Sequence, residues 1–121
     1  RDKKICLIPM VPLAVGFLTG RYRKGEIDLE GRLNTAADKG FADAYFTDKN
    51  FQLLATMDVI AKNQGVSLAQ VAAAWLLSHE EIPSVITGIT RMEHLEDNAA
   101  AAELSLSPEE LELLNRESAA L

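Results

Sequence analysis

The chain has 121 residues, of which 48% are hydrophobic and 25% charged, a composition that excludes a disordered chain and indicates a globular domain. The net charge of −6 is unevenly distributed, because residues 1–32 carry seven Lys/Arg against four Asp/Glu and residues 33–121 carry five against fourteen. The acidic remainder excludes nucleic-acid binding through a broad basic face, and the lack of an apolar run of roughly 20 residues excludes a membrane span.

The first residues suggest both a compartment and a context. Cys6 is the only cysteine, which excludes an internal disulfide framework and suits a reducing compartment, so we expect a cytoplasmic protein. Cys6 stands in an apolar run, where we expect it to be buried as a small hydrophobe. The chain starts without Met, so we expect it to be a piece of a longer protein.

A strand and a long loop come first. Residues 5–11 form a continuous β-rich apolar run closed by Pro12, which is typical of a strand buried on both faces of a parallel sheet. Residues 12–46 contain five glycines and no sustained helical period, so they predict a loop with a short helical turn at 13–18. A loop of this length is usually functional or mobile, and we expect residues 19–46 to be mobile without a ligand.

Two helices follow the loop. Thr47 is a good N-cap for a helix whose apolar positions repeat at three-and-four spacing, and Gly65 is its expected end. Ser67 and Gln70 form a capping box ahead of the small apolar run 71–77. That second helix is apolar nearly all round, so we expect it to pack deeply against a sheet, with its tryptophan in the core.

A second strand and two more helices complete the chain. Residues 82–87 predict a buried strand, residues 92–102 a helix, and residues 107–118 a helix opened by a serine N-cap, Pro and a capping box. This alternation predicts parallel βα units. Two strands cannot close a parallel sheet, so apolar faces and strand edges should lack partners, which come from the rest of a longer chain or from a second copy.

Several common sites are excluded by spacing. The stretch from Gly16 to Arg21 has three residues between its glycines and no Lys-Ser/Thr, so it is no P-loop, and no Gly-x-Gly-x-x-Gly occurs. His79 and His94 lack a partner at helical zinc spacing, so we expect no metal. No nucleophile-elbow sequence supports a serine triad.

Residues 88–98 are the informative segment. A glycine ends a buried strand and a helix begins within a few residues, an arrangement whose free N–H groups and positive potential suit a phosphate. Thr90 and Arg91 can donate hydrogen bonds to such an anion, and Thr90, His94 and Asp97/Asn98 recur at helical spacing. An ordinary capped surface helix and scattered solvated basic residues remain the alternatives at this point.

The two turn regions together resemble one family. Residues 11–22 (VPLAVGFLTGRY) resemble the segment Ser-Pro-Leu-x-x-Gly-x-Leu-Thr-Gly-Lys/Arg-Tyr that follows barrel strand seven of the aldo-keto reductases. Residues 68–77 resemble the penultimate barrel helix of that family, and residues 86–98 its Ile-Pro-Gly-x-x-x-x-Glu-Gln-Leu-x-Glu-Asn signature. Residues 106–111 match its ending. The resemblance covers nearly the whole chain in the right order.

The resemblance implies an α/β fold, the C-terminal portion of a (β/α)₈ TIM barrel that is incomplete in this chain. Residues 1–121 would then be one segment, with a strand and turn at 1–18, the long loop at 19–46, and helices with the last strand at 47–121. A full barrel needs about 250 residues, and barrel enzymes often bind phosphate with the loops after strands seven and eight.

The resemblance also implies an NADP(H) site, with a preference for NADP over NAD. Pro12, Leu13 and Ala14 would line the pyrophosphate, and Arg21 and Arg32 would clamp phosphate from the long loop. The group at the second turn would hold the 2′-phosphate and face the adenosine: Gly88, Thr90 and Arg91 for the phosphate, and His94, Asp97 and Asn98 for the adenosine. The chain departs from the family pattern in having Val11 for Ser, His94 for Gln and Asp97 for Glu.

The family's catalytic Asp, Tyr, Lys and His come from earlier strands, and nothing in this chain matches them. Tyr22 and Tyr45 are therefore not assigned that role, and we expect no catalytic residue here. The expected function is the cofactor-binding segment of an NADP(H)-dependent reductase of aldehydes or ketones, inactive alone. The alternatives are a non-catalytic NADP-binding regulatory module, and a half-barrel that self-associates or needs the missing N-terminal part.

Overall fold

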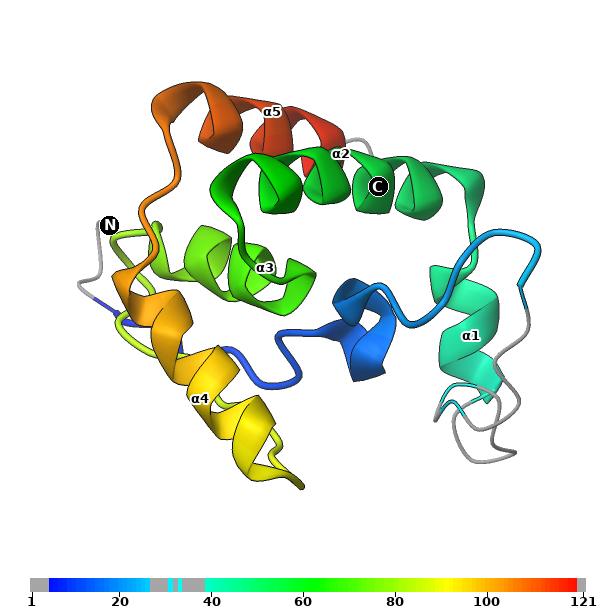
Figure 1. Cartoon of the computed structure of the whole chain (residues 1–121), viewed down its shortest axis with the longest axis horizontal. Coiled ribbons are helices and arrows are strands. Elements are labelled where there is room, and N and C mark those ends of the chain that lie inside the picture. The colour runs from blue at the N-terminus through cyan, green and yellow to red at the C-terminus, as the bar shows by residue number, and fades with distance from the viewer. Residues whose placement is uncertain (1–4, 27–30, 32, 34–38, 120–121) are drawn as a thin grey trace.

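The computed structural model of the protein describes residues 5–26, 31, 33 and 39–119. Figure 1 shows α2 and α5 side by side in one layer, α3 beneath them, and α4 reaching away from that layer. The elements in chain order are the 3-10 helix η1 (Ala14–Thr19), α1 (Lys39–Tyr45), α2 (Asp48–Gln64), α3 (Leu68–Leu77), α4 (Met92–Ala100), the 3-10 helix η3 (Ala101–Glu103) and α5 (Pro108–Ala119).

The core lies where η1, α2, α3 and α5 meet, and we call these four elements the helical body. Leu54 of α2 and Val71 of α3 are fully buried there, and Leu114 of α5 is buried with them. Phe17 of η1 packs against three aromatic rings with centroids 5.5–6.0 Å away, those of Tyr45, Phe46 and Phe51. Aromatic packing at this spacing fixes η1 and the end of α1 to the start of α2.

The predicted starts of three helices are confirmed. A hydroxyl oxygen before each helix accepts a backbone N–H three residues on: Asn50 to Thr47 at 3.2 Å, Gln70 to Ser67 at 3.1 Å and Glu110 to Ser107 at 3.2 Å. Both capping boxes are complete. Gly65 ends α2 with a φ of 69°, the left-handed conformation that glycine adopts without strain.

The second of these helices, α3, is buried along most of its length, as its apolar sequence predicts. Its packing partners differ from the prediction, because among the described elements it contacts α2, α4, η1 and η3 rather than a sheet. Trp75 is partly buried against the core, and its indole Nε1 donates to Asn115 Oδ1 at 2.8 Å. The tryptophan therefore joins α3 to α5, with its polar end paired.

The prediction of two buried strands is wrong for the residues that the structure describes. Residues 5–11 and 82–87 form no strand and share one isolated parallel bridge, between Met10 and Ile86. Leu7, Ile8 and Met10 are each more than half exposed, and Cys6, expected to be buried, is exposed as well. The physical reason is that a parallel sheet needs further strands and covering layers to bury such a run.

We call residues 5–12 and 82–100 the open side. Large hydrophobic side chains are exposed along both of its segments, among them Ile5, Leu7 and Met10 in the first and Ile86, Ile89 and Met92 in the second. The sequence prediction that apolar faces would lack partners is confirmed here. Residues 5–26, 31, 33 and 39–119 do not form a barrel.

The predicted loop at 12–46 is partly wrong, because α1 lies inside it. Phe41 and Tyr45 stand one helical turn apart with their rings stacked at 6.1 Å, and Ala42 is buried between the helix and the core. The glycines of this segment obscured a short helix that is stabilised by tertiary aromatic contacts. The predicted turn at 13–18 is confirmed as η1.

Candidate functional site

The two turns singled out by the sequence emerge at the same edge of the molecule. The parallel bridge joins Met10 to Ile86, and the Ile86 N–H donates to the Pro9 carbonyl oxygen at 3.0 Å. Pro12 and Gly88 each lie two residues beyond this bridge. Because adjacent parallel segments run about 4.8 Å apart, both turns begin side by side.

The turn after residue 10 has an unusual backbone. Val11, Ala14 and Val15 have φ values of 60°, 49° and 58°, in the left-handed region that residues with a Cβ rarely adopt. The Ala14 N–H donates to the Val11 carbonyl oxygen at 3.0 Å, which closes the turn. Such conformations persist only when surrounding structure holds them, and they cluster at ligand sites.

The start of α4 differs from the starts of α2, α3 and α5. Arg91 is the N-cap, with extended backbone, and its side chain makes no cap hydrogen bond. Residues 88–96 are all exposed. The start of α4 therefore has no side-chain cap and consists of exposed residues, with Arg91 at the N-cap, an arrangement that can accept an anion.

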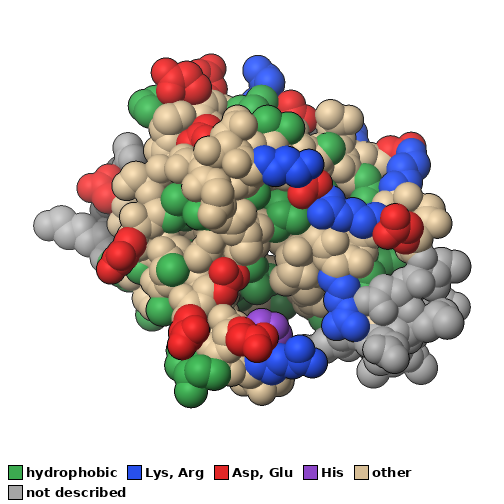
Figure 2. Space-filling view, in the orientation of Figure 1, with side chains coloured by type: hydrophobic (Ala, Val, Ile, Leu, Met, Phe, Trp, Pro, Cys, Tyr) green, Lys and Arg blue, Asp and Glu red, His purple; other side chains and the backbone are tan. Residues whose placement is uncertain are grey.

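The predicted site residues differ in exposure. Figure 2 shows a hollow between the α4 region and the region of the long loop, with a histidine and Lys/Arg side chains at its rim. Five predicted residues are exposed and five are partly buried: Arg21, Gly88, Thr90, Arg91 and His94 in the first group, and Pro12, Leu13, Ala14, Asp97 and Asn98 in the second. Arg21 is exposed just after η1, and Arg32 lies outside the described residues.

Asp97 has a protein partner that the sequence did not suggest. Its Oδ2 accepts a hydrogen bond from the Ser67 hydroxyl at 2.7 Å, which links α4 to the N-terminus of α3. Ser67 is recognisable from sequence as an N-cap, but an N-cap hydroxyl can also donate, and only the fold brings Asp97 within reach.

Two contacts hold the start of the long loop, one within the loop and one to the helical body. The Tyr22 ring is buried, and its hydroxyl oxygen accepts the Leu33 N–H at 3.0 Å. Arg23 forms a bidentate pair with Asp58 of α2, in which Nη2 and Oδ1 are 3.2 Å apart and Nη1 bonds Oδ2. The hydrogen bonds that Arg23 donates to this carboxylate raise the pKa of Arg23 above its ordinary value, so the guanidinium stays charged.

These anchors were missed by sequence reasoning, which singled out Arg21 and Arg32 of the same segment. The sequence feature that could have suggested the ion pair is Asp58. It is a carboxylate at an inward-facing position of an amphipathic helix, where a charged side chain needs a partner. The partner comes from 35 residues earlier and is set by tertiary structure. Arg21 is thus held two residues before the ion pair and one before the Tyr22 anchor.

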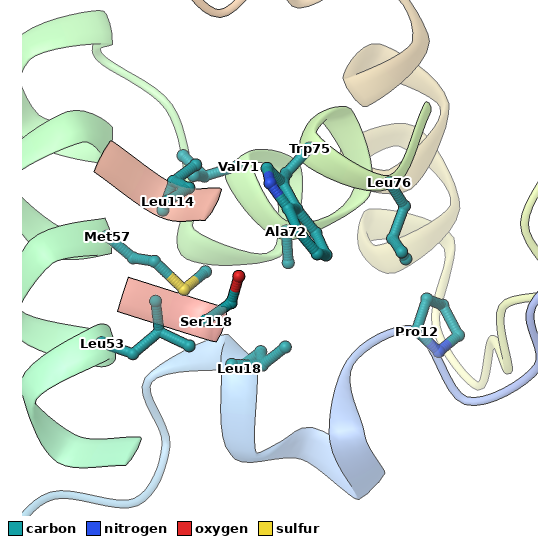
Figure 3. A pocket seen from close by; sticks show the side chains of 10 residues that line it. All are labelled: Pro12, Leu18, Leu53, Met57, Val71, Ala72, Trp75, Leu76, Leu114 and Ser118. Carbon is teal, nitrogen blue, oxygen red and sulfur yellow. The ribbon is translucent and has the colours of Figure 1, made fainter. Parts of the chain in front are cut away.

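An apolar cavity of about 80 Å³ lies within the helical body (Figure 3). Side chains of η1, α2, α3 and α5 line it, including Leu53, Val71 and Leu114, and Pro12 and Leu76 border one end. Its lining is almost entirely apolar, with Ser118 the one hydroxyl among the lining side chains, so it is poorly suited to a phosphate. The two turns at the open side are the better candidate site.

Other chemistry-bearing residues have structural partners. The His79 ring lies edge-on to Trp75 at 4.8 Å, with Nδ1 2.8 Å from the Trp75 carbonyl oxygen. Tyr22 and Tyr45 pack in the aromatic core. In the part of the chain that the structure describes, no group of three or more His, Cys, Asp or Glu could hold a metal ion, and no helix is long and apolar enough to span a membrane.

Comparison with known proteins gives a consistent result. The sequence model of the aldo/keto reductase family matches residues 1–118. The chain is 38% identical over 107 residues to an L-glyceraldehyde 3-phosphate reductase of Escherichia coli O157:H7, covering 86% of this chain and 31% of that protein. It is 30% identical over 107 residues to the aldo-keto reductase yakc [NADP(+)] of Schizosaccharomyces pombe, covering 88% and 31%.

A relative with a different kind of name is equally similar. The chain is 38% identical over 93 residues to a probable voltage-gated potassium channel subunit beta of Arabidopsis thaliana, covering 77% of this chain and 28% of that protein. The chain therefore spans about three tenths of the length of the curated relatives it matches.

Proposed function

Because this chain belongs to the aldo/keto reductase family, we propose that it is the NADP(H)-binding part of an oxidoreductase that reduces aldehydes or ketones. The observation that carries the proposal is the uncapped start of α4 beside the turn at residue 12. Side chains cap the starts of α2, α3 and α5, whereas α4 begins at Arg91 without a side-chain cap.

The described residues fit a dinucleotide phosphate. The α4 N-terminus with Thr90 and Arg91 supplies N–H, hydroxyl and guanidinium donors for a 2′-phosphate, and His94 and Asn98 follow on the same helix. Pro12 to Ala14 would lie along the pyrophosphate, and Arg21 and Arg32 would reach it from the long loop. The bound cofactor supplies the hydride, and the residues of this chain bind and orient it.

Proton transfer to the carbonyl oxygen is assigned to residues outside this chain, so we propose that the chain alone is inactive. The name of the fission yeast relative, which includes NADP(+), supports the choice of cofactor. The barrel built with the remaining strands, the carbonyl substrate class and a cytoplasmic location are part of the same proposal.

The test is cofactor binding by the full-length protein with Arg91→Ala. Loss of charge-assisted hydrogen bonds to the 2′-phosphate should weaken NADPH about 10- to 100-fold and NADH little, as measured by calorimetry. Arg116→Ala, the same change on α5, is the matched control and should alter neither affinity. Equal losses for NADPH and NADH would remove the 2′-phosphate assignment.

A second candidate is a regulatory module of the same fold that binds NADP without turnover. It is favoured by the relatives in Arabidopsis thaliana and Oryza sativa that are named probable voltage-gated potassium channel subunits beta. Oxidation of NADPH by the full-length protein with an aldehyde supports the enzyme, and binding of NADPH with no oxidation supports the module.

A third candidate is a half-barrel that self-associates, and the exposed hydrophobic side chains of the open side favour it. Light scattering separates it from the first two. A monomer with a complete core would count against self-association.

A further inference from the structure

The helix that carries the candidate 2′-phosphate residues is weakly attached to the molecule. No side chain of α4 is buried, and its two largest hydrophobic residues, Met92 and Leu95, are 68% and 44% exposed. Its C-terminal end is held through Ala101 of η3, which is buried. Within the described residues of this chain, packing alone therefore leaves the N-terminal turns of α4 with little to fix their position.

A side-chain hydrogen bond ties α4 to the N-terminus of α3. The Ser67 hydroxyl donates to Asp97 Oδ2 at 2.7 Å and at the same time accepts the Gln70 N–H at 3.1 Å. The Ser67 N–H donates to Gln70 Oε1 at 3.0 Å, so Ser67 is held from both sides. The hydroxyl has a single hydrogen, and its direction is set because the oxygen already accepts from Gln70.

The hydrogen bond between Ser67 and Asp97 should be strong for two reasons. Its acceptor is a carboxylate, which makes the hydrogen bond charge-assisted, and both groups are partly buried. The carboxylate also lies at the N-terminus of α3, where the helix dipole favours a negative charge. Asp97 stands three residues after His94 and six after Arg91, so fixing it fixes the helix that presents both.

We propose that Asp97 is a positioning residue, which through Ser67 sets the place of the α4 N-terminus relative to the turn at residue 12. This inference rests on the proposed NADP(H) site and identifies the Ser67–Asp97 hydrogen bond as the contact that holds α4 in place beside the turn at residue 12. In this role the carboxylate acts on the cofactor through α4, rather than by contacting the adenosine.

The experiment measures the affinity of the full-length protein for 2′-phospho-AMP in four forms: the unchanged protein, Asp97→Ala, Ser67→Ala and the double variant. Each single variant should weaken binding about three- to tenfold, and the double variant should be no weaker than either. Asp97→Asn, which keeps an oxygen acceptor for the Ser67 hydroxyl, should restore most of the affinity.

Thr47→Ala is the control for loss of a helix cap, because it removes the same kind of cap from α2, away from the site, and should leave affinity unchanged. If Asp97→Ala weakens binding and Ser67→Ala does not, Asp97 contacts the ligand directly and the positioning role is wrong. If neither variant changes the affinity, the role is also wrong. No binding of 2′-phospho-AMP by the unchanged protein would instead overturn the proposed function, and this inference with it.

Discussion

Leucine, isoleucine and valine make up similar proportions of the helical body and the open side, but their burial differs. In the helical body these side chains meet across four elements, and Leu54 is 1% exposed. On the open side the same residue types stand at the surface, and Leu7 is 58% exposed. The difference teaches that an apolar run describes what a segment can bury, whereas the partners available decide what it does bury.

A matched pair of truncations tests most directly whether the two regions differ in packing. Leu54→Ala should lower the free energy of unfolding by about 3 kcal/mol, because it leaves a cavity in a closely packed core. Leu7→Ala, the same chemical change on the open side, should cost less than about 0.5 kcal/mol. Urea unfolding of the chain measures both, and equal costs would mean that the open side is packed in solution.

A second pair of variants tests whether the long loop unfolds together with the helical body. A Cβ at Gly31 would stand 2.5 Å from Tyr22 Cε1, and the Tyr22 ring is buried against Phe46, so Gly31→Ala should cost about 2 kcal/mol. Gly40 lies in α1 with open space around it, so Gly40→Ala should stabilise by about 0.5 kcal/mol. Thermal unfolding distinguishes the two, and a neutral Gly31→Ala would place the loop outside the cooperative fold.

The smallest effect concerns the helix starts. Ser107→Ala removes the side-chain cap of α5 and should cost about 1 kcal/mol. Arg91→Ala changes the N-cap of α4, where no side-chain bond is lost, so stability should stay within a few tenths of a kcal/mol. Chemical denaturation of both variants tests this contrast. A large loss for Arg91→Ala would show that the residue supports the fold rather than a ligand.

The helices and their ends were predictable because their signals are local. Thr47, Gly65, Ser67 and Ser107 act within one turn of chain, so their roles can be read from a few neighbouring residues. The burial of α3 was predictable from its composition for the same reason. Its partners were not, since any apolar surface can cover it.

Contacts between residues that are far apart in the sequence could not be predicted from the sequence. The short helix α1 packs on the Phe17 ring of η1, and the Arg23–Asp58 and Ser67–Asp97 pairs join residues 35 and 30 positions apart. The exposure of Cys6 follows from absent neighbours, which no local pattern records. For the site, the residues at the two turns were identified from the family resemblance, and their common edge follows from one parallel bridge.

The hydrogen bond between Tyr22 and Leu33 turns the stretch between them into a closed ring of chain whose two ends are fixed. For a ring of this kind, doubling the number of residues costs only about 0.6 kcal/mol in closure entropy. A change in the number of residues between Tyr22 and Leu33 should therefore cost little free energy while these two residues stay in contact.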